Sequence, residues 1–200
     1  MRSIIKETDW DIPFETNSHL QNVVSRERCE RIKRLSNNRL KNMQLFSELT
    51  MITEASKDLQ VPPDKIHIFK TPEGKPFIMG FENYHISVSH CDNIIMFASD
   101  SSPVGVDIEK PRKDIEKLSK RFFTSAEYEK IMNASSKEDE FLIVWTRKES
   151  YVKLIGTGLK TPLDSFNVYD DSCYTYTTQD YVSAMTGKRY ICSSVCIKKR

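Results

Sequence analysis

The stretch that decides the fold runs from position 84 to position 109 and reads YHISVSHCDN at 84–93, IIMFASD at 94–100 and SSPVGVDIE at 101–109. It contains three runs rich in apolar and β-branched residues, at 84–89, 94–99 and 104–109, separated by short polar breakers at 90–93 and 100–103. Short apolar runs between turn-forming residues predict successive β-strands. The middle of the chain is therefore expected to form three neighbouring strands, and helices must come from the segments on either side.

Helical patterns flank these strands on both sides. The long segment 25–59 is expected to be helical, with Ser25 as the residue that caps its start. Further helices are predicted at 115–123, 125–132 and 138–155, and further strands at 2–6, 66–69, 166–169 and 190–197. This order of elements predicts an α+β fold rather than a doubly wound parallel sheet. A seam near residue 103 would divide the chain into two halves, 1–103 and 104–200.

The composition limits the class of protein. Of the 200 residues, 38% are hydrophobic, and 30 basic against 28 acidic residues give a net charge of +2. This balance excludes a strongly basic nucleic-acid-binding protein. No apolar stretch approaches the roughly 18 residues of a membrane span, and the N-terminal MRSIIKETDW does not resemble a secretory signal. The five cysteines have no disulfide or zinc spacing, so we expect free thiols in a cytoplasmic protein.

The run GVDIE at 105–109 carries two acids at alternate positions of a predicted strand. Side chains alternate along a strand, so Asp107 and Glu109 share one face while the residues between them face the core. Two carboxylates on one face could bind a hard cation such as Mg²⁺. The alternative is an ordinary half-exposed strand whose acids are solvated.

The run WTRKESYVK at 145–153 places Glu149 and Lys153 four positions apart, on one face of a predicted helix. Glu149 could complete a metal site as a third carboxylate, and Lys153 could hold a phosphate. The alternative is an exposed ion pair that contributes about 0.3 kcal/mol.

Four other positions carry polar groups whose role the sequence leaves open. Glu127 fits the N3 position of a capping box begun by Thr124, and it could instead act as a base. Ser89 and His90 end a predicted strand without the Gly-x-Ser-x-Gly pattern of a hydrolase, so His90 is either structural or a phosphate ligand. Lys75 lies in the predicted turn TPEGKPF, which lacks the spacing of a nucleotide-binding phosphate loop.

A basic segment opens the long helical stretch. Seven basic residues lie between positions 26 and 41, and Arg28 and Arg31 among them are three apart on one helical face. These two arginines could grip a phosphate. The alternative is a solvated face, which is the usual fate of a run of charges.

In their order and spacing these motifs resemble one family. The matching runs are GKPF at 74–77, HISVSH at 85–90, GVDIE at 105–109, RFFTSAEY at 121–128, WTRKESYVK at 145–153 and GTGL at 156–159. From about Ser25 to Leu163 the chain resembles the 4′-phosphopantetheinyl transferases of the long, surfactin-type class. The resemblance implies two similar α+β halves related by a pseudo-two-fold axis, with the active site at their interface. It assigns the nucleotide-phosphate grip to 1–103 and the metal-binding carboxylates to 104–200.

The resemblance also implies a reaction. Such enzymes transfer the phosphopantetheine arm of coenzyme A to a serine of an apo carrier protein and release adenosine 3′,5′-bisphosphate. Breaking a pyrophosphate needs a metal and cations on the leaving group, and the expected metal is Mg²⁺, with Mn²⁺ as a substitute. The implied ligands of the metal are Asp107, Glu109 and Glu149, and the implied ligands of coenzyme A are Arg28, Arg31, Lys75, Ser89, His90 and Lys153.

The proton acceptor stays open between two carboxylates. The base that takes the serine proton is either Glu149 or Glu127, and Lys153 would neutralise or protonate the leaving phosphate. A metal-bound carboxylate is a poor base, because the cation stabilises its charged form, which favours Glu127 or an intervening water. Against this, Glu127 could be only a helix cap.

The implied partner is an acyl or peptidyl carrier protein of a fatty-acid, polyketide or non-ribosomal peptide synthase, met by a monomeric enzyme that binds neither membrane nor nucleic acid. Segment 113–128, which alternates basic with apolar residues, is the expected docking site. The chain departs from the family pattern at Met43-Gln44, where long-class relatives tend to carry an arginine. The alternative functions are a non-catalytic coenzyme A-binding module and a Mg²⁺-dependent phosphohydrolase.

Overall fold

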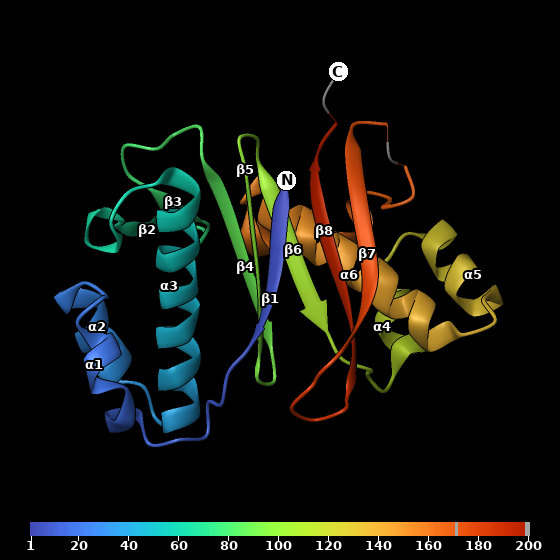
Figure 1. The fold of residues 1–200 in the computed structure, drawn as a ribbon. Helices are drawn as coiled ribbons and strands as arrows, with labels where there is room; N and C mark the ends of the chain where they lie inside the picture. The colour runs from blue at the N-terminus through green and yellow to red at the C-terminus, as the bar shows by residue number, and fades with distance from the viewer. Residues whose placement is uncertain (171, 199–200) are drawn as a thin grey trace.

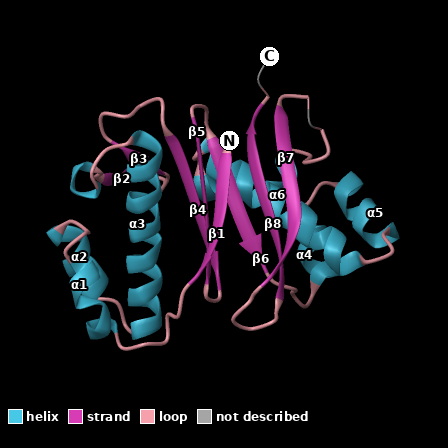
Figure 2. Cartoon of the chain, in the orientation of Figure 1, coloured by secondary structure: helices cyan, strands magenta, loops and turns pink. Residues whose placement is uncertain are grey.

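Two three-stranded sheets lie between two groups of helices (Figures 1 and 2). The structure is a computed structural model that describes residues 1–170 and 172–198. Its strands are β1 (Arg2–Glu7), β2 (Ile68–Lys70), β3 (Pro76–Ile78), β4 (His85–Cys91), β5 (Ile94–Asp100), β6 (Val104–Glu109), β7 (Tyr174–Val182) and β8 (Arg189–Ile197). Its α-helices are α1 (Ser18–Gln21), α2 (Arg26–Lys33), α3 (Asn38–Leu59), α4 (Ile115–Phe122), α5 (Ser125–Asn133) and α6 (Lys137–Ile155).

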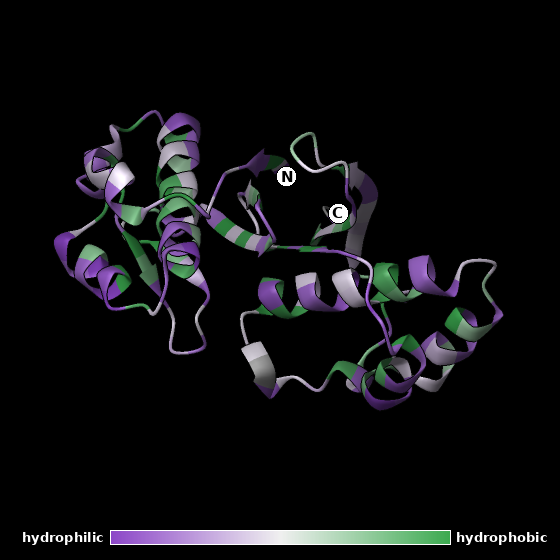
Figure 3. Ribbon diagram, turned by 90° about the horizontal axis from the view of Figure 1, so that it is seen from below, coloured by the Kyte–Doolittle hydropathy of each residue, from purple (hydrophilic) through white to green (hydrophobic). Residues whose placement is uncertain are grey.

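The strands form antiparallel sheets. One three-stranded sheet has the order β1-β5-β4, a second has the order β6-β8-β7, and β2 and β3 form a two-stranded hairpin. Viewed from below, the helices α1–α3 and the helices α4–α6 lie on separate sides of the strands (Figure 3). Antiparallel sheets with helices confirm the α+β class predicted from the order of the elements.

Most of the helical and strand predictions hold. The short helix α1 and the strand β3 were not predicted, and Pro76 and Phe77 of β3 lie in the segment TPEGKPF that was expected to be a turn. Three other segments also differ. The single helix expected over 25–59 is wrong: Ser25 caps α2, whose helical turns end at 33, and Asn37 then caps α3 by accepting a hydrogen bond from the backbone of Leu40. The strand expected at 166–169 is wrong, because this segment is irregular and its backbone bonds to buried side chains. Strand β7 was not predicted, since YTYTTQDYV has too few aliphatic residues.

The two sheets share a hydrophobic core. Val104, Val106 and Ile108 on one face of β6 pack in a single buried cluster with residues of β5, among them Ile94 and Met96. At the neighbouring edge, a backbone N–H of β6 donates a hydrogen bond to a serine hydroxyl of β4. The halves therefore cannot separate without exposing apolar surface that both bury.

Glu7 fastens the first strand to the last hairpin. Its carboxylate accepts hydrogen bonds from the Tyr181 hydroxyl at 2.5 Å, the Ser183 hydroxyl at 3.1 Å, and the backbone N–H groups of Ala184 and Met185 at 2.7 and 2.9 Å. Burial raises the pKa of Glu7, but these four bonds outweigh it and lower the pKa overall. The N-terminal strand and the β7–β8 turn are thus held by one ionised side chain.

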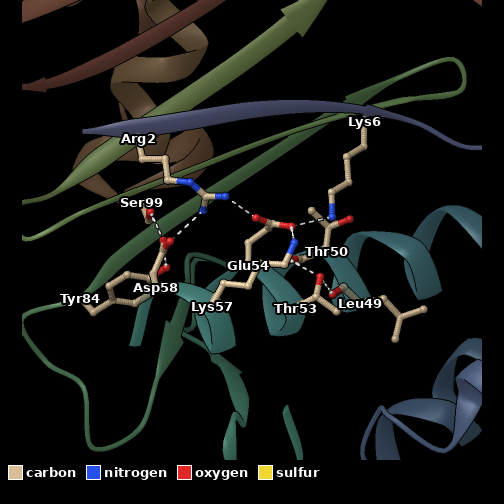
Figure 4. Close-up of polar contacts among 10 residues, drawn as sticks. All are labelled: Arg2, Lys6, Leu49, Thr50, Thr53, Glu54, Lys57, Asp58, Tyr84 and Ser99. Atoms are coloured by element: carbon tan, nitrogen blue, oxygen red, sulfur yellow. Dashed lines mark hydrogen bonds and ion pairs between the residues drawn. The ribbon is translucent and has the colours of Figure 1, made fainter. Parts of the chain in front are cut away.

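Glu54 on α3 fastens the first strand from the other side, as Figure 4 shows. Its side chain is 2% exposed and accepts bonds from Arg2, from Lys6 at 2.7 Å and from Lys57 at 2.9 Å. Next to it, Asp58 accepts bonds from Arg2 and from two hydroxyl groups. Burial raises the pKa of Glu54, but the three cations lower it overall, to about 2.

No helix in the described ranges 1–170 and 172–198 has both the length and the apolar character needed to cross a membrane.

We expect Glu54→Gln to lower the free energy of unfolding by about 2 kcal/mol at pH 7. This value allows for solvent screening, because the cations that pair with Glu54 are partly exposed. The folded-state pKa lies below that of the unfolded chain, so this stabilisation is complete above about pH 5 and is lost as the pH falls towards 2. Urea unfolding at pH 7 and pH 3 measures it. The control is Glu30→Gln, which removes an exposed pair with Lys33 and should cost less than about 0.5 kcal/mol. An equal loss for Glu54→Gln at both pH values would contradict the prediction.

Candidate active site

Helix α6 lies directly on strand β6, and Gly105 is the point of contact. A Cβ atom at this position would stand 1.8 Å from the carbonyl oxygen of Ser150 and 2.7 Å from the backbone nitrogen of Leu154. Only glycine fits such an approach of two backbones. Since Asp107 and Glu109 share this face of the strand, the contact sets them against the helical turn that carries Glu149 and Lys153.

Asp107, Ser89 and Lys153 form a closed polar group below the surface. The Lys153 ammonium donates to Asp107 Oδ1 at 2.7 Å and to the Ser89 hydroxyl at 2.8 Å, and that hydroxyl donates to the same Oδ1 at 2.8 Å. The Asp107 side chain is 5% exposed. Its second oxygen, Oδ2, is buried without a hydrogen-bond partner among residues 1–170 and 172–198. An unpartnered buried carboxylate oxygen is costly unless something else satisfies it.

Burial and the negative charge of Asp107 raise the pKa of two neighbouring carboxylates, Glu149 and Glu109. Burial raises the pKa of Glu149, and the charges of Asp107 and Glu109 raise it further. Burial raises the pKa of Glu109 as well, although the Arg112 guanidinium pairs with it at 2.5 Å. Arg112 in turn lies over the ring of Trp145, 4.7 Å from its centroid. The three acids thus repel one another in a poorly solvated place.

The donor set fits a hard divalent cation. Among the described residues, no three histidine, cysteine, aspartate or glutamate side chains are grouped to ligate a metal as they stand. The chemistry nevertheless suits one, because the site has carboxylate oxygens, an orphaned Oδ2 on Asp107 and a mutual repulsion that a cation would relieve.

A cavity of about 560 Å³ opens above this group, between the two halves of the chain. The N-terminal half contributes cations to its lining, and α6 contributes Glu149 and Lys153. The charged and imidazole side chains of the lining are Arg28, Lys70, Glu73, Lys75, His90, Arg121, Glu149, Lys153 and Asp164. A second cavity of about 800 Å³ shares Arg28, Lys70 and Gly74 with the first and adds Arg31.

The chain was compared with known proteins, and both of its halves match models of one family. Residues 103–194 match the 4′-phosphopantetheinyl transferase superfamily, and residues 8–102 match the N-terminal region of 4′-phosphopantetheinyl transferase. The chain is 31% identical to the 4′-phosphopantetheinyl transferase Sfp of Bacillus subtilis, over 80% of this chain and 72% of that protein. It belongs to the 4′-phosphopantetheinyl transferase superfamily.

Other relatives agree with this membership. The chain is 34% identical to a second 4′-phosphopantetheinyl transferase of Bacillus subtilis, over 72% of this chain and 66% of the relative, and 32% identical to the transferase gsp of Aneurinibacillus migulanus, over 78% and 67%. The chain thus spans about two thirds of the length of these two relatives. The predicted surfactin-type class and the prediction of an enzyme are confirmed.

In this member of the superfamily, four of the six residues predicted to hold coenzyme A line the first cavity. Arg28, Lys75, His90 and Lys153 line it, while Ser89 lies just below, bonded to Lys153. Arg31 lines only the second cavity.

Besides Lys153, two more of these cations have protein partners. The Arg28 guanidinium donates hydrogen bonds to Glu48 at 3.1 Å and to Gln44 at 2.6 Å. Gln44, where the chain departs from the family pattern, is therefore a hydrogen-bond partner of Arg28. The Lys75 ammonium donates to the carbonyl oxygen of Leu154 at the end of α6, and burial lowers the pKa of this lysine. An arriving phosphate would compete with these bonds.

Both carboxylate oxygens of Glu127 have protein partners. Its capping box with Thr124 is present, Oε1 accepts from the backbone of Val168 at 2.9 Å, and Oε2 pairs with Lys148 at 2.8 Å. The side chain is 0% exposed and does not line either cavity. The transferase therefore uses this carboxylate to organise its C-terminal half.

The sequence reasoning missed Lys70, which lines both cavities. No hydrogen bond or ion pair reaches its ammonium from the described residues, and partial burial and the nearby Arg28 lower its pKa. A lone lysine at the end of a short strand carries no motif. Only the hairpin of β2 and β3 brings it to the cavity.

We expect Gly105→Ala to abolish activity together with the native packing of α6 on β6. The added methyl group would overlap the backbone of α6, and neither backbone can retreat without repacking the core. The loss of stability should reach about 3 kcal/mol or more, measured by urea unfolding. The matched control is Gly187→Ala, a glycine of the β7–β8 turn with nothing near its Cβ position, where only the positive φ is strained. A Gly105→Ala protein as stable as the Gly187→Ala protein would contradict the close contact.

Proposed function

We propose that this chain transfers the 4′-phosphopantetheine arm of coenzyme A to a serine of an apo acyl or peptidyl carrier protein and releases adenosine 3′,5′-bisphosphate. The observation that carries the proposal is the cavity between the halves. Its cations suit the nucleotide phosphates, and its inner end carries Glu149 and Lys153 beside the orphaned oxygen of Asp107. We also propose that the halves 1–103 and 104–200 are related by a pseudo-two-fold axis. This is supported by the three-stranded antiparallel sheet and the long helix, α3 or α6, that each half contains.

The carboxylates of Asp107, Glu109 and Glu149 would hold Mg²⁺, or Mn²⁺ in its place. When bound, such a cation supplies charge neutralisation at the pyrophosphate. The rest of the chemistry falls to the side chains of this chain. Lys153 and Arg112 balance part of the negative charge of Asp107 and Glu109 before any substrate arrives.

In the transfer, the serine Oγ of the carrier forms a new bond to the phosphorus of the phosphopantetheine group, and the bond from that phosphorus to the bridging oxygen breaks. Because a metal-bound carboxylate is a weak base, we assign the serine proton to Glu149 acting through an intervening water molecule. This carboxylate lines the cavity and has no hydrogen-bond or ion-pair partner among the described residues, whereas both oxygens of Glu127 are occupied and sealed from solvent.

The leaving phosphate of adenosine 3′,5′-bisphosphate needs a cation nearby. Lys153 is 30% exposed at the floor of the cavity and is oriented by Asp107 and Ser89. Its ammonium would neutralise the charge that builds on the bridging oxygen and could supply it with a proton. Arg28, Lys75 and His90 would bind the remaining phosphates at the rim.

The proposed partner docks near α4. The basic residues Lys113, Lys117, Lys120 and Arg121 of this segment are exposed, and Arg121 also lines the cavity. Of the apolar side chains of this segment, some of which would be exposed for contact in a docking site, Phe123 is buried, and Ile115, Leu118 and Phe122 are half-buried against the core of the C-terminal half. Steering of an acidic carrier by the exposed charges is therefore the part of the docking proposal that the structure supports.

The test of this function is intact mass spectrometry of apo carrier proteins incubated with coenzyme A, Mg²⁺ and the protein. The carrier should gain the mass of phosphopantetheine, in step with release of adenosine 3′,5′-bisphosphate. Release of the bisphosphate without a carrier would indicate a phosphohydrolase. Binding of coenzyme A without either product would indicate a binding module.

We expect Asp107→Ala to reduce transfer by about a thousandfold, because the loss removes a carboxylate from the proposed metal site and the anchor of Lys153. Initial rates of carrier modification measure it, and circular dichroism checks that the variant is folded. Glu138→Ala, an exposed acid in the first turn of α6, is the matched control and should leave the rate unchanged. Turnover near the wild-type value at saturating Mg²⁺ would refute the role of Asp107.

We expect the double change Arg28→Ala and Arg31→Ala to raise KM for coenzyme A about tenfold or more, and to change KM for dephospho-coenzyme A little. A charge-assisted bond to the 3′-phosphate is worth about 1.5–3 kcal/mol, and only coenzyme A has that phosphate. Steady-state kinetics with both substrates measure the difference. The control pair is Arg34→Ala with Arg39→Ala, two basic residues of the same segment that line neither cavity. Equal effects on the two substrates would remove the arginines from this role.

A further inference from the structure

An ion pair without any solvent exposure lies behind the candidate active site. Lys148 Nζ stands 2.8 Å from Glu127 Oε2, and both side chains are 0% exposed. Neither side chain lines either of the two cavities described above. Two buried charges are expensive to desolvate, so a pair of this kind persists only where its geometry and further hydrogen bonds are good.

Three further bonds of the pair go to the segment 163–168 that follows α6. Lys148 donates to the carbonyl oxygens of Leu163 and Phe166, each at 2.6 Å, and its ammonium lies 4.3 Å from the centroid of the Phe166 ring. Glu127 accepts from the backbone N–H of Val168 at 2.9 Å. Three backbone groups between 163 and 168 are thereby satisfied by two side chains instead of by a sheet.

Glu127 is itself fixed from the other side. Its Oε2 accepts from both the backbone N–H and the hydroxyl of Thr124, each at 2.9 Å, in the capping box of α5. The start of α5, the middle of α6 and the irregular segment therefore meet at one carboxylate.

The far side of the same segment faces the cavity. Thr161, Pro162, Leu163 and Asp164 are part of the cavity lining, opposite the turn and strands contributed by the N-terminal half. One residue along α6 from the buried Lys148, Glu149 lines the cavity as well. Neighbouring residues of a helix point about 100° apart. Lys148 can therefore bind the segment that forms the wall, while Glu149 faces the cavity.

We propose that Lys148 is a positioning residue, which with Glu127 clamps segment 161–168 as the wall of the cavity and so sets the affinity for coenzyme A. This inference rests on the proposed function for the identity of the ligand, while the clamp itself does not. Lys148 touches no substrate in this role, and it acts through the carbonyl groups of Leu163 and Phe166. Without the clamp the wall is free to shift, and part of the binding free energy is then spent on ordering it.

The test variant is Lys148→Met, which keeps an unbranched side chain against Phe166 and removes the ammonium. Hydrogen exchange without ligand should show faster exchange at Val168 and its neighbours, with α3 and the β1-β5-β4 sheet unchanged. Calorimetry should show coenzyme A binding weakened about tenfold, the loss expected for a wall that must be reordered. In steady-state kinetics, KM for coenzyme A should rise while KM for the carrier protein stays the same.

Two further variants separate the clamp from a general loss of stability. Ile94→Ala cuts the core that the two sheets share, away from both cavities, so it should lower Tm while leaving coenzyme A binding within about twofold of wild type. Lys148→Met combined with Glu127→Gln removes the unpaired buried charge and should recover part of the lost Tm. It should not recover coenzyme A binding, because the two carbonyl groups still lack their donor.

The outcomes separate the inference from the proposed function. Recovery of coenzyme A binding in step with Tm, or unchanged exchange at 163–168 in Lys148→Met, would overturn the clamp. A wild-type protein that does not bind coenzyme A would overturn the proposed function and the choice of ligand, whereas faster exchange in the variant would still support the clamp.

Discussion

The contact between the backbones of α6 and β6 at Gly105 is the constraint on which the rest of the structure depends. Because nothing stands between them, the acids of one strand face and the polar face of one helix meet within hydrogen-bonding distance, as the bond from Lys153 to Asp107 shows. A larger residue at 105 would push the helix outwards and open this distance. The clustering of charge that any pyrophosphate chemistry needs is thus a consequence of a packing requirement in the core.

The cavity is a property of both halves at once. Its cations come largely from α2, the β2–β3 hairpin and β4, and two of its acids, Glu149 and Asp164, come from α6 and the segment after it. Two bonds tie the hairpin turn to the C-terminal half, from Lys75 to the carbonyl oxygen of Leu154 and from Lys160 to Glu73. The shared core between β5 and β6 holds the two sides together from below, so the cavity has a fixed floor and a rim built from long side chains.

The sequence predicted best where one local rule decides the structure. Strand 104–109 has the predicted bounds, and the capping box begun by Thr124 is present, because alternation and capping act within a few residues. The membership of the family was also readable, from ordered motifs. The sequence does not predict the break at Asn37, because the helical pattern continues across it. It predicts a strand at 166–169, because an apolar run does not reveal that buried side chains will bind its backbone. Lys70 could not be found at all, since its place depends on tertiary packing.

Glu127 and Lys148 show why a motif residue is a poor guide to its own role. Both belong to runs that mark the family, and a carboxylate in such a run invites the role of a base. In the structure every oxygen of Glu127 is engaged, and its partner lysine is as fully buried. Glu149, the next residue after that lysine, faces the cavity with no protein partner in the described part of the chain. The dipeptide Lys148-Glu149 thus joins a structural cation to the anion that we propose as the proton acceptor, and a change at either position would disturb activity. Only the direction in which each side chain points distinguishes the two causes, and this direction follows from the helical phase that the contact at Gly105 imposes.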